Sequence, residues 1–593
     1  AYAETHARIL GFPEKKYKFK LDAFLIPQTA SNMKYLKQRF ATWEYEIEED
    51  AIDVMKVQDL TETQQELKSK RRWEYIFEDQ VPALPVIDEL KTTPFKQQVV
   101  GLDALHQSEF FGLLMEMGTG KTKICIDEIC WTGKGKFLIV CPKSVQQSWV
   151  DEFETHAWKP YHLTKLKRNV KGVEGLVKGL QSTEDIKVWV INYEGVSGLL
   201  DPLLRMEFDM VILDESTYIK NRKAKRTKAI QYLGSTATRR VILNGTPAPN
   251  NLLDLYSQFE FLKPGVLGYT NYNQFRKYYA QFKKSKGGFE KLVGYQNLEQ
   301  LKMRMATCSF FVKKKQCLDL PEKQFVTRKL DMTPKQEEMY QMMLEICLAD
   351  LEGNMSPEGT VSASVIIVQL LRLSQIACGF LRTTDGNTRN IPGGNPKLEA
   401  LKEILETTDG KVIVWARFKQ DVENIVSMVQ LDLNEGCVCI TGAENERMRD
   451  QAKRSFNSDD GARILVGNPA TGGLGLTLLG GDNLRCTTVV YYSNDFSCYK
   501  RLQSEDRTHR IGLRNPVTYY DLVCQGTVEE RILNVLQDKK ELNEVIANYK
   551  ELKGFLLGSR KGDKMNILKT KKKEISQDLF DLMNNKDAWD QEL

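Results

Sequence analysis

A short stretch near residue 120 has the residue types and spacing of a phosphate-binding loop. It runs from Gly112 to Thr122 as Gly-Leu-Leu-Met-Glu-Met-Gly-Thr-Gly-Lys-Thr. Glycines let backbone N–H groups turn toward phosphate oxygens, Lys121 can reach the β- and γ-phosphates of a nucleotide, and the Thr122 hydroxyl can hold Mg²⁺. The apolar segment that follows predicts a helix whose positive end adds to the anion site. A complete motif has glycine where Met115 stands, so a glycine turn before a core helix remains the alternative.

An acidic pair, Asp214-Glu215, follows an apolar run of the kind that forms a buried strand. Downstream of a phosphate loop, such a pair divides the work of hydrolysis. Asp214 can hold Mg²⁺, and Glu215 can polarise the water that attacks the γ-phosphate. The alternative is an ordinary turn at the end of a strand.

A third group of polar residues lies near residue 505. Gln503, Arg507 and Arg510 are spaced by four and three residues, which places them on one face of a predicted helix. Two arginines on one face can neutralise the charge that develops on a transferring phosphoryl group. A salt-bridged helix surface is the alternative, but the surrounding segment is an α/β run without a phosphate loop of its own, which favours the catalytic interpretation.

The elements that must position these residues are apolar strands alternating with helices. Continuous apolar runs of this length are typical of parallel sheets covered on both faces, and ligands gather at the carboxyl ends of such strands. The first group of predicted strands is Phe137–Cys141, Val188–Ile191, Met210–Leu213 and Arg240–Leu243, and the second is Lys411–Trp415, Cys437–Ile440, Arg463–Val466, Thr488–Tyr491 and Val517–Tyr520. Between the groups, residues 250 to about 385 have helical periodicity.

The composition is that of an ordinary globular protein. The chain has 593 residues, 27% of them charged, and a net charge of +5, so it does not require a nucleic-acid partner but could hide a local basic groove. The sequence has no apolar run long enough to cross a membrane, and its first residues lack the apolar h-region expected of a signal peptide. Its 12 cysteines are scattered without C-x-x-C spacing, and it has five histidines. We therefore expect a reducing, cytoplasmic compartment, no membrane partner and no histidine-based metal site.

Taken together, these motifs resemble the Swi/Snf-like family of DNA-translocating ATPases of helicase superfamily two. The match is ordered along residues 94 to about 535, and it includes the helical insertion around Leu255-Tyr-Ser and Pro264-Gly-Val-Leu-Gly268 that distinguishes this family from other helicases. Thr217, Thr477 and Leu513 depart from the family's usual residues. The compact chain is most like bacterial or bacteriophage members.

The resemblance implies an α/β fold with two RecA-like lobes, helical insertions, a small N-terminal α+β region and a helical C-terminal tail. The expected domains are an N-terminal accessory domain (1–90), an ATP-binding lobe (91–250), a helical insertion and linker (251–390), a second lobe (391–540) and a charged tail (541–593).

The resemblance also assigns residues to ATP, to Mg²⁺ and to DNA. The expected catalytic residues are Lys121, Asp214, Glu215, Gln503, Arg507 and Arg510, with Thr122 and Asp214 at the metal. The expected nucleotide contacts are Phe95, Gln98 (an amide suited to the adenine edge), Met117, Gly118, Thr119, Gly120, Lys121, Thr122, Gly473 and Gly475. The expected DNA contacts are Pro142, Lys143, Ser144, Asn192, Tyr193, Arg417, Thr441, Gly442 and Thr471.

The expected activity is ATP-driven movement along double-stranded or branched DNA by a monomeric motor, working with replication or recombination proteins in a prokaryotic or virus-infected cell. Two alternatives stay open. The first is a strand-separating helicase or the motor subunit of a restriction or defence complex. The second is a non-enzymatic interaction protein on a decayed ATPase fold, against which the intact Lys121 and Glu215 argue.

Overall fold

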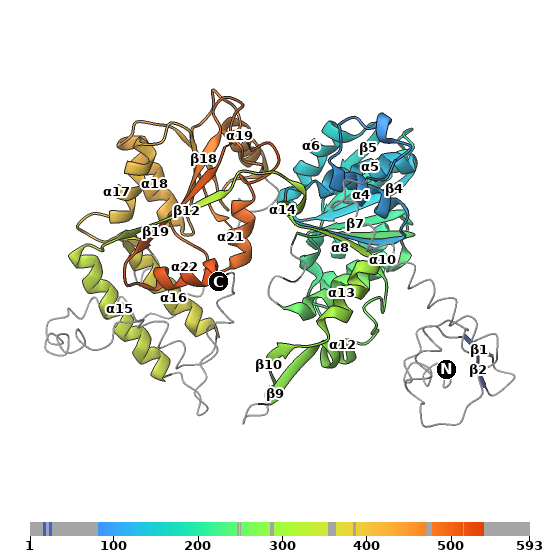
Figure 1. The fold of residues 1–593 in the computed structure, drawn as a ribbon, viewed down its shortest axis with the longest axis horizontal. Coiled ribbons are helices and arrows are strands. Elements are labelled where there is room, and N and C mark those ends of the chain that lie inside the picture. The colour runs from blue at the N-terminus through green and yellow to red at the C-terminus, as the bar shows by residue number, and fades with distance from the viewer. Residues whose placement is uncertain are drawn as a thin grey trace. The chain divides into compact units, whose positions relative to one another are not determined.

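The computed structural model describes residues 16–18, 23–25, 81–245, 248, 251–284, 290–353, 363–382, 387–469, 477–513 and 515–538. Within these ranges the chain forms two compact units, one with the elements between residues 81 and 317 and one with those between 318 and 538 (Figure 1). Each unit has its own parallel sheet, which confirms the predicted α/β class. Near the N-terminus, β1 (Lys16–Lys18) pairs antiparallel with β2 (Ala23–Leu25). The tail expected at 541–593 lies outside the described residues.

The first unit is built on a seven-stranded sheet with the order β11-β3-β8-β7-β4-β6-β5, in which all neighbours run parallel. Its strands are β3 (Phe110–Met115), β4 (Gly135–Cys141), β5 (Tyr161–Lys165), β6 (Ile186–Asn192), β7 (Met210–Asp214), β8 (Arg239–Leu243) and β11 (Ser309–Val312). The four strands predicted from apolar runs are confirmed as β4, β6, β7 and β8. Strand β3 overlaps the stretch that was interpreted as a loop, β5 is only partly apolar, and the short apolar β11 lies in the region that was interpreted as helical.

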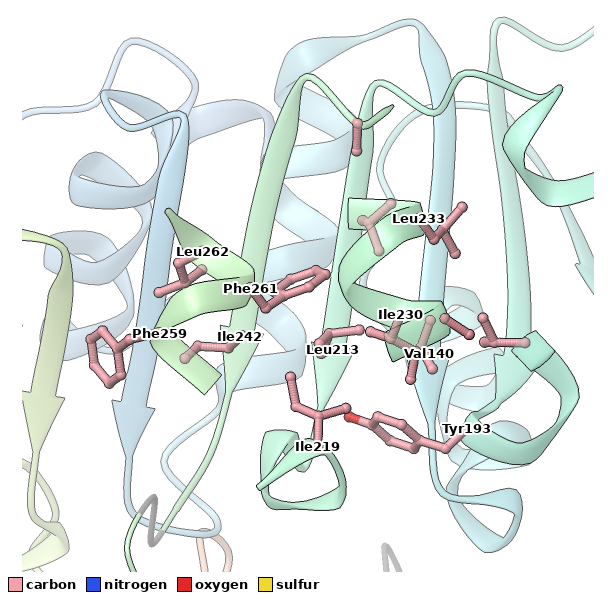
Figure 2. Close-up of a cluster of buried hydrophobic side chains, with 14 of the residues drawn as sticks. Val140, Tyr193, Leu213, Ile219, Ile230, Leu233, Ile242, Phe259, Phe261 and Leu262 are labelled. Carbon is pink, nitrogen blue, oxygen red and sulfur yellow. The ribbon is translucent and has the colours of Figure 1, made fainter. Parts of the chain in front are cut away.

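Both faces of this sheet are covered by helices, and apolar residues of a strand alternate between the two faces. In β7, Val211 and Leu213 belong to one hydrophobic cluster, whereas Met210 and Ile212 belong to the other. Figure 2 shows part of the first cluster, where Leu213 and Ile242 of the sheet meet Phe261 and Leu262. The covering helices are α4 (Lys96–His106), α5 (Lys121–Thr132), α6 (Gln146–His156), α7 (Val170–Leu180), α8 (Tyr193–Gly198), α9 (Leu200–Leu204), α10 (Lys225–Thr236) and α11 (Leu255–Leu262), with short turns η1 (Ile87–Glu89), η2 (Lys143–Val145), η3 (Ser216–Ile219) and η4 (Leu252–Asp254).

The segment after β8 was expected to be helical, and the structure corrects this in part. Helices α11, α12 (Tyr272–Tyr279), α13 (Leu298–Thr307) and α14 (Lys314–Cys317) are interrupted by a two-stranded sheet of β9 (Ala280–Lys284) and β10 (Glu290–Tyr295). Elements up to α14 belong to the first unit. The remainder of the predicted linker, from 318 onward, belongs to the second.

The second unit is built on a six-stranded parallel sheet with the order β12-β19-β18-β15-β17-β16. Its strands are β12 (Lys323–Leu330), β15 (Lys411–Trp415), β16 (Cys437–Ile440), β17 (Ile464–Gly467), β18 (Cys486–Tyr491) and β19 (Val517–Cys524). The five strands predicted for this lobe are confirmed. The edge strand β12 was not predicted, because five of its eight residues are polar or charged and it is half-buried to exposed throughout.

Two long helices lie between β12 and β15, within the region for which helical periodicity was predicted. They are α15 (Pro334–Gly353) and α16 (Ala363–Ala377), which pack with α22 (Val528–Gln537) in one hydrophobic cluster. A small antiparallel sheet of β13 (Phe380–Arg382) and β14 (Thr388–Asn390) follows. The sheet itself is covered by α17 (Pro396–Glu406), α18 (Lys419–Leu431), α19 (Glu446–Phe456) and α21 (Cys498–Glu505), with further hydrophobic clusters around its strands.

Candidate ATP site and nucleic-acid contacts

The phosphate loop has the backbone that the sequence predicts. It joins the end of β3 to the start of α5, and Gly118 and Gly120 have φ angles of 78° and 94°, a region that side chains other than glycine seldom enter. Gly120 also lacks room for a side chain, since an added Cβ would lie 1.8 Å from Nε2 of Gln98. Met115 is the last residue of β3 and is fully buried. A glycine is therefore not required at that position.

The geometry of the loop is supported by hydrogen bonds to its own carbonyl groups. Lys121 Nζ donates to the carbonyl oxygens of Met115, at 2.7 Å, and Glu116, at 3.3 Å. The Thr119 hydroxyl donates to the same Glu116 oxygen at 2.7 Å. The lysine ammonium is thus held at the mouth of the loop, where a nucleotide phosphate would replace the carbonyl groups as its partner.

The two residues predicted to contact the base flank the loop. Gln98 is buried, and its Oε1 accepts a hydrogen bond of 2.9 Å from the backbone N–H of Phe95 at the start of α4. The amide therefore caps α4 and packs against Gly120. The Phe95 ring remains 43% exposed, so it is available to stack on a base.

Asp214 lies at the carboxyl end of β7, close to the loop in the register of the sheet. Strand β8 separates β7 from β3, and Leu243 of β8 is paired with Asp214 on one side and Leu113 on the other. Two buried aromatic residues hold Asp214. Trp149 Nε1 donates to its Oδ2 at 2.9 Å, and the Tyr193 hydroxyl donates to its backbone carbonyl at 2.8 Å.

Glu215 has a strained backbone. Its φ of 60° and ψ of 56° place it in the left-handed region, and its side chain is 8% exposed. Non-glycine residues in this region cost on the order of 1–3 kcal/mol, and such strain clusters at functional sites. The conformation lies at the junction where the chain passes from β7 into η3.

The residues after Glu215 are joined to β8 and α11 by a buried hydrogen-bond triad that the sequence did not predict. The Ser216 hydroxyl donates to Gln258 Oε1 at 2.7 Å, and Asn244 Nδ2 donates to both, at 3.2 Å and 3.1 Å. All three side chains are fully buried. Thr217, where the family commonly has histidine, is outside this triad. The link between the acidic motif and the third motif therefore passes through Ser216.

The third motif also touches the phosphate loop directly. An added Cβ on Gly245 would lie 2.9 Å from Cγ of Met117, so glycine permits this close approach. Thr246, Pro247, Pro249 and Asn250 of the motif lie outside the described residues.

In the second unit, the prediction that Gln503, Arg507 and Arg510 share one helix face is wrong. Helix α21 ends at Glu505, so only Gln503 lies on it. The carbonyl of Glu505 accepts hydrogen bonds from the hydroxyl groups of Thr508 and Tyr519 and from the backbone N–H groups of Thr508 and His509, in the turn that follows the helix. Arg507 is buried with its Nε donating to the Gln503 carbonyl, and Arg510 donates to the Thr477 hydroxyl at 2.5 Å. Both arginines thus lie in the turn after α21.

A buried ionic network fixes α21 on the sheet. Arg501 contacts Glu505 on its own helix at 2.8 Å and Asp521 of β19 at 2.5 Å, and Lys323 of β12 contacts Glu505 at 2.8 Å. Burial acts to raise the pKa of Glu505, but Lys323 and Arg501 outweigh it and hold the pKa below its usual value. The network supports the segment that carries the predicted arginines.

Predicted DNA contacts in the first unit gather at the carboxyl ends of β4 and β6. Cys141 pairs with Asn192, so Pro142, Lys143 and Ser144 lie beside Asn192 at one edge of the sheet. Lys143 is exposed, Ser144 and Asn192 are half-buried and Pro142 is buried. Tyr193 requires a correction, because its side chain is fully buried in the hydrophobic cluster, as Figure 2 shows beside Ile219, and bonded to Asp214. It cannot contact DNA in this conformation.

In the second unit, the ends of β15, β17 and β16 lie side by side, since Gly467 pairs with both Trp415 and Ile440. This register brings the predicted contacts Arg417, Thr441 and Gly442 to one edge. Asn468, which was not predicted, donates to the Arg417 carbonyl at 2.7 Å and holds this loop. Arg417 stacks on Phe496 with its guanidinium carbon 3.8 Å from the ring centre. Thr471, Gly473 and Gly475 lie outside the described residues.

The donors fit a magnesium ion that is bound together with nucleotide phosphate. Over the described ranges, no group of three or more histidine, cysteine, aspartate or glutamate side chains forms a metal cluster. Mg²⁺ commonly uses one or two protein oxygen ligands together with phosphates and water. Thr122 at the start of α5 and Asp214 held by Trp149 supply such a set.

Among the helices that the structure describes, none is long and apolar enough to span a bilayer.

Comparison with protein-family models shows the family to which this chain belongs. Residues 28–379, more than half of the chain, match the SNF2-related domain, and residues 396–512 match the helicase conserved C-terminal domain. The chain belongs to the SNF2-related family. Membership confirms the predicted enzyme class, a P-loop, DNA-dependent ATPase of helicase superfamily two. It does not distinguish a bacterial or bacteriophage member from a eukaryotic one.

Three curated relatives illustrate the range of this family. The chain is 27% identical over 534 residues, 78% of its length, to the TATA-binding protein-associated factor MOT1 of Saccharomyces cerevisiae. It is 25% identical over 455 residues to the SWI/SNF-related matrix-associated actin-dependent regulator of chromatin subfamily A-like protein 1 of Xenopus laevis. It is 24% identical over 457 residues to an uncharacterised ATP-dependent helicase of Mycoplasma pneumoniae. Each of these two matches covers 75% of the present chain. The matches cover only 28%, 43% and 41% of these relatives.

Among solved structures, the chain is similar to the Sulfolobus solfataricus SWI2/SNF2 ATPase core in complex with dsDNA. The identity is 22%, the TM-score is 0.35, and the match covers 76% of this chain and 92% of the other.

Proposed function

We propose that this SNF2-related protein moves along double-stranded DNA at the expense of ATP, and so remodels branched DNA or displaces bound proteins. The observation that carries the proposal is the arrangement at the carboxyl edge of the first sheet. The phosphate loop after β3, Asn244 after β8 and Asp214 after β7 follow neighbouring strands. A nucleotide bound there would contact the Lys121 ammonium and would lie near Asp214, the proposed metal ligand, and the buried carboxylate of Glu215.

Each residue has a distinct role in the proposed reaction. Lys121 exchanges its carbonyl partners for the β- and γ-phosphates, and Thr122 and Asp214 would hold Mg²⁺, which neutralises phosphate charge. Glu215 orients and polarises the attacking water. Gln503, Arg507 and Arg510 would neutralise the charge that develops on the γ-phosphate. The reaction is mainly one of positioning and charge stabilisation.

DNA would be held through its phosphates at the carboxyl edges of the two sheets. In the first unit, Lys143 and Asn192 supply a cation and an amide. In the second unit, Arg417 and Thr441 supply a cation and a hydroxyl. Contacts of this type are tolerant of sequence, and binding should weaken steeply with salt.

We propose replication, recombination or repair as the setting, in a compact bacterial or bacteriophage member that works as a monomer with proteins of those processes. The yeast relative is named for its association with the TATA-binding protein, which supports a task on protein-bound DNA. The chain covers less than half of each relative described above, so the relatives' whole activities are not carried over to it.

The test is ATP turnover with blunt duplex, single-stranded and forked DNA of equal length, followed by a triplex-displacement assay for movement on duplex. Stimulation by duplex or forked DNA together with triplex displacement is expected. Stimulation by single strands alone would overturn the duplex proposal and favour a strand-separating helicase, an alternative supported by the naming of the Mycoplasma relative as a helicase. No turnover with any DNA would favour a non-enzymatic role.

A further inference from the structure

The indole of Trp149 lies against the carboxylate that we assign to magnesium. Trp149 is on α6, it is fully buried, and its Nε1 donates a 2.9 Å hydrogen bond to Oδ2 of Asp214. The two residues are 65 positions apart in the chain. No motif that we recognise in the sequence includes this tryptophan as part of the ATP site.

A hydrogen bond from a buried donor fixes one carboxylate oxygen, and hence the plane in which the carboxylate lies. The backbone of Asp214 is fixed independently by the Tyr193 hydroxyl at 2.8 Å. Trp149 itself cannot adjust easily, because its ring is fully buried in the hydrophobic cluster that includes Phe153 of the same helix. A rigid donor of this kind orients a metal-binding side chain before the metal arrives.

We propose that Trp149 is a positioning residue that orients Asp214 for Mg²⁺ and thereby sets the magnesium requirement for nucleotide binding. The inference rests on the proposed ATP site. Helix α6 begins at Gln146, directly after η2, where Lys143 and Ser144 are proposed DNA contacts. A single helix thus connects the proposed DNA edge to the proposed magnesium ligand.

Trp189 provides a matched control. It is also fully buried in the first unit, on β6, and its indole also donates one hydrogen bond, at 3.3 Å, but to the backbone carbonyl of Gly175 in α7. Trp149→Phe and Trp189→Phe each remove one indole ring system and one donor. Only the first substitution removes a bond to Asp214.

The measurement is binding of a fluorescent ATP analogue as a function of Mg²⁺ concentration, which needs no hydrolysis. We expect Trp149→Phe to raise the half-saturating Mg²⁺ concentration about tenfold or more, as loss of a hydrogen bond behind a metal ligand typically does. Trp189→Phe should leave it unchanged. In an Asp214→Asn background the effect of Trp149→Phe should vanish, since the substitution acts through that carboxylate.

An unchanged magnesium requirement in Trp149→Phe, or an equal shift in both variants, would overturn the inference. If Trp149→Phe does not fold, benzothienylalanine incorporated at position 149 removes the N–H and keeps the shape of the ring, and the same shift is expected. Failure of the proposed ATP site is distinguishable from failure of this inference. In that case the unsubstituted protein itself would show no Mg²⁺-dependent binding of the nucleotide.

Discussion

Asn244 donates a 3.1 Å hydrogen bond to the Oε1 of Gln258, and both side chains are completely buried. Asn244 follows β8 at the ATP site, whereas Gln258 is on α11 of the helical insertion. Ser216, next to Glu215, donates to the same oxygen. One amide oxygen therefore ties the acidic motif and the third motif to the insertion.

Substitution Gln258→Met should break this triad without leaving a large cavity. The hydroxyl of Ser216 and the amide of Asn244 would lose a buried acceptor, and we expect a loss of about 1–3 kcal/mol in the free energy of unfolding. We also expect weaker stimulation of ATP turnover by DNA. Chemical denaturation and turnover with and without DNA measure the two effects. Gln336→Met is the control, because Gln336 is a buried glutamine bonded to the Ile376 and Ala377 carbonyls in the second unit. It should lower stability while DNA stimulation persists.

Substitution Lys121→Ala should reduce ATP turnover at least about a hundredfold, since it removes the cation at the transferring phosphate. Lys187→Ala is a suitable comparison. The ammonium of Lys187 on β6 also donates to a backbone carbonyl, but this is the carbonyl of Leu180 at the end of α7, and the contact is exposed. Turnover should be unaffected there. Near-normal turnover in Lys121→Ala would contradict the assignment of the phosphate loop.

Glu215 should show a conflict between stability and catalysis. Substitution Glu215→Gln should lower turnover by about 10²–10⁴ while nucleotide binding persists. Glycine at this position relieves the left-handed strain, so Glu215→Gly should raise the free energy of unfolding by about 1 kcal/mol and still abolish turnover.

Glu207 is the matched control for this strain. It too has a left-handed backbone, with φ of 49°, but it lies in an exposed turn before β7. Glu207→Gly should bring the same stabilisation with full activity. Equal activity in Glu207→Gly and Glu215→Gly would argue against a catalytic role for Glu215.

The second unit should lose stability as the pH rises from about 4 to about 7. Burial raises the pKa of Asp421 to about 7, against the opposing effect of a 2.6 Å hydrogen bond from Ser493. In the unfolded chain this carboxyl titrates near 4, so between the two values the folded state binds more protons and its stability falls with rising pH. Above pH 7 both states are ionised and the loss is complete.

Asp421→Asn should remove that pH dependence and stabilise the protein at pH 8, by an amount on the order of 3 kcal/mol. Denaturant midpoints at pH 5, 6, 7 and 8 measure it. Asp432→Asn, an exposed carboxyl at the end of the same helix, should leave the slope as it is. If the denaturant midpoints of Asp421→Asn and of the unsubstituted protein change with pH in parallel, Asp421 is not the group that causes the loss of stability.

Local sequence patterns were sufficient to predict those strands, turns and site residues whose structure depends on a single short segment. The apolar runs of β4 and β7, the turn at Gly118 and Gly120, and the acidic pair at the end of β7 all follow from short stretches. What could not be predicted depends on partners distant in sequence. Trp149 and Asp214 meet across 65 positions, and Ser216 and Gln258 across 42. The burial of Tyr193 depends on the packing of α8 against the hydrophobic cluster.

The ammonium of Lys121 donates hydrogen bonds to the carbonyl oxygens of Met115 and Glu116 within the phosphate loop. Nucleotide binding is therefore an exchange of partners, and its enthalpy is the difference between two sets of charge-assisted hydrogen bonds. Such an exchange limits affinity for the product, because ADP lacks the phosphate that best competes with the carbonyls. A motor that repeats its cycle needs this property, since a loop that held its product tightly would stop after one step.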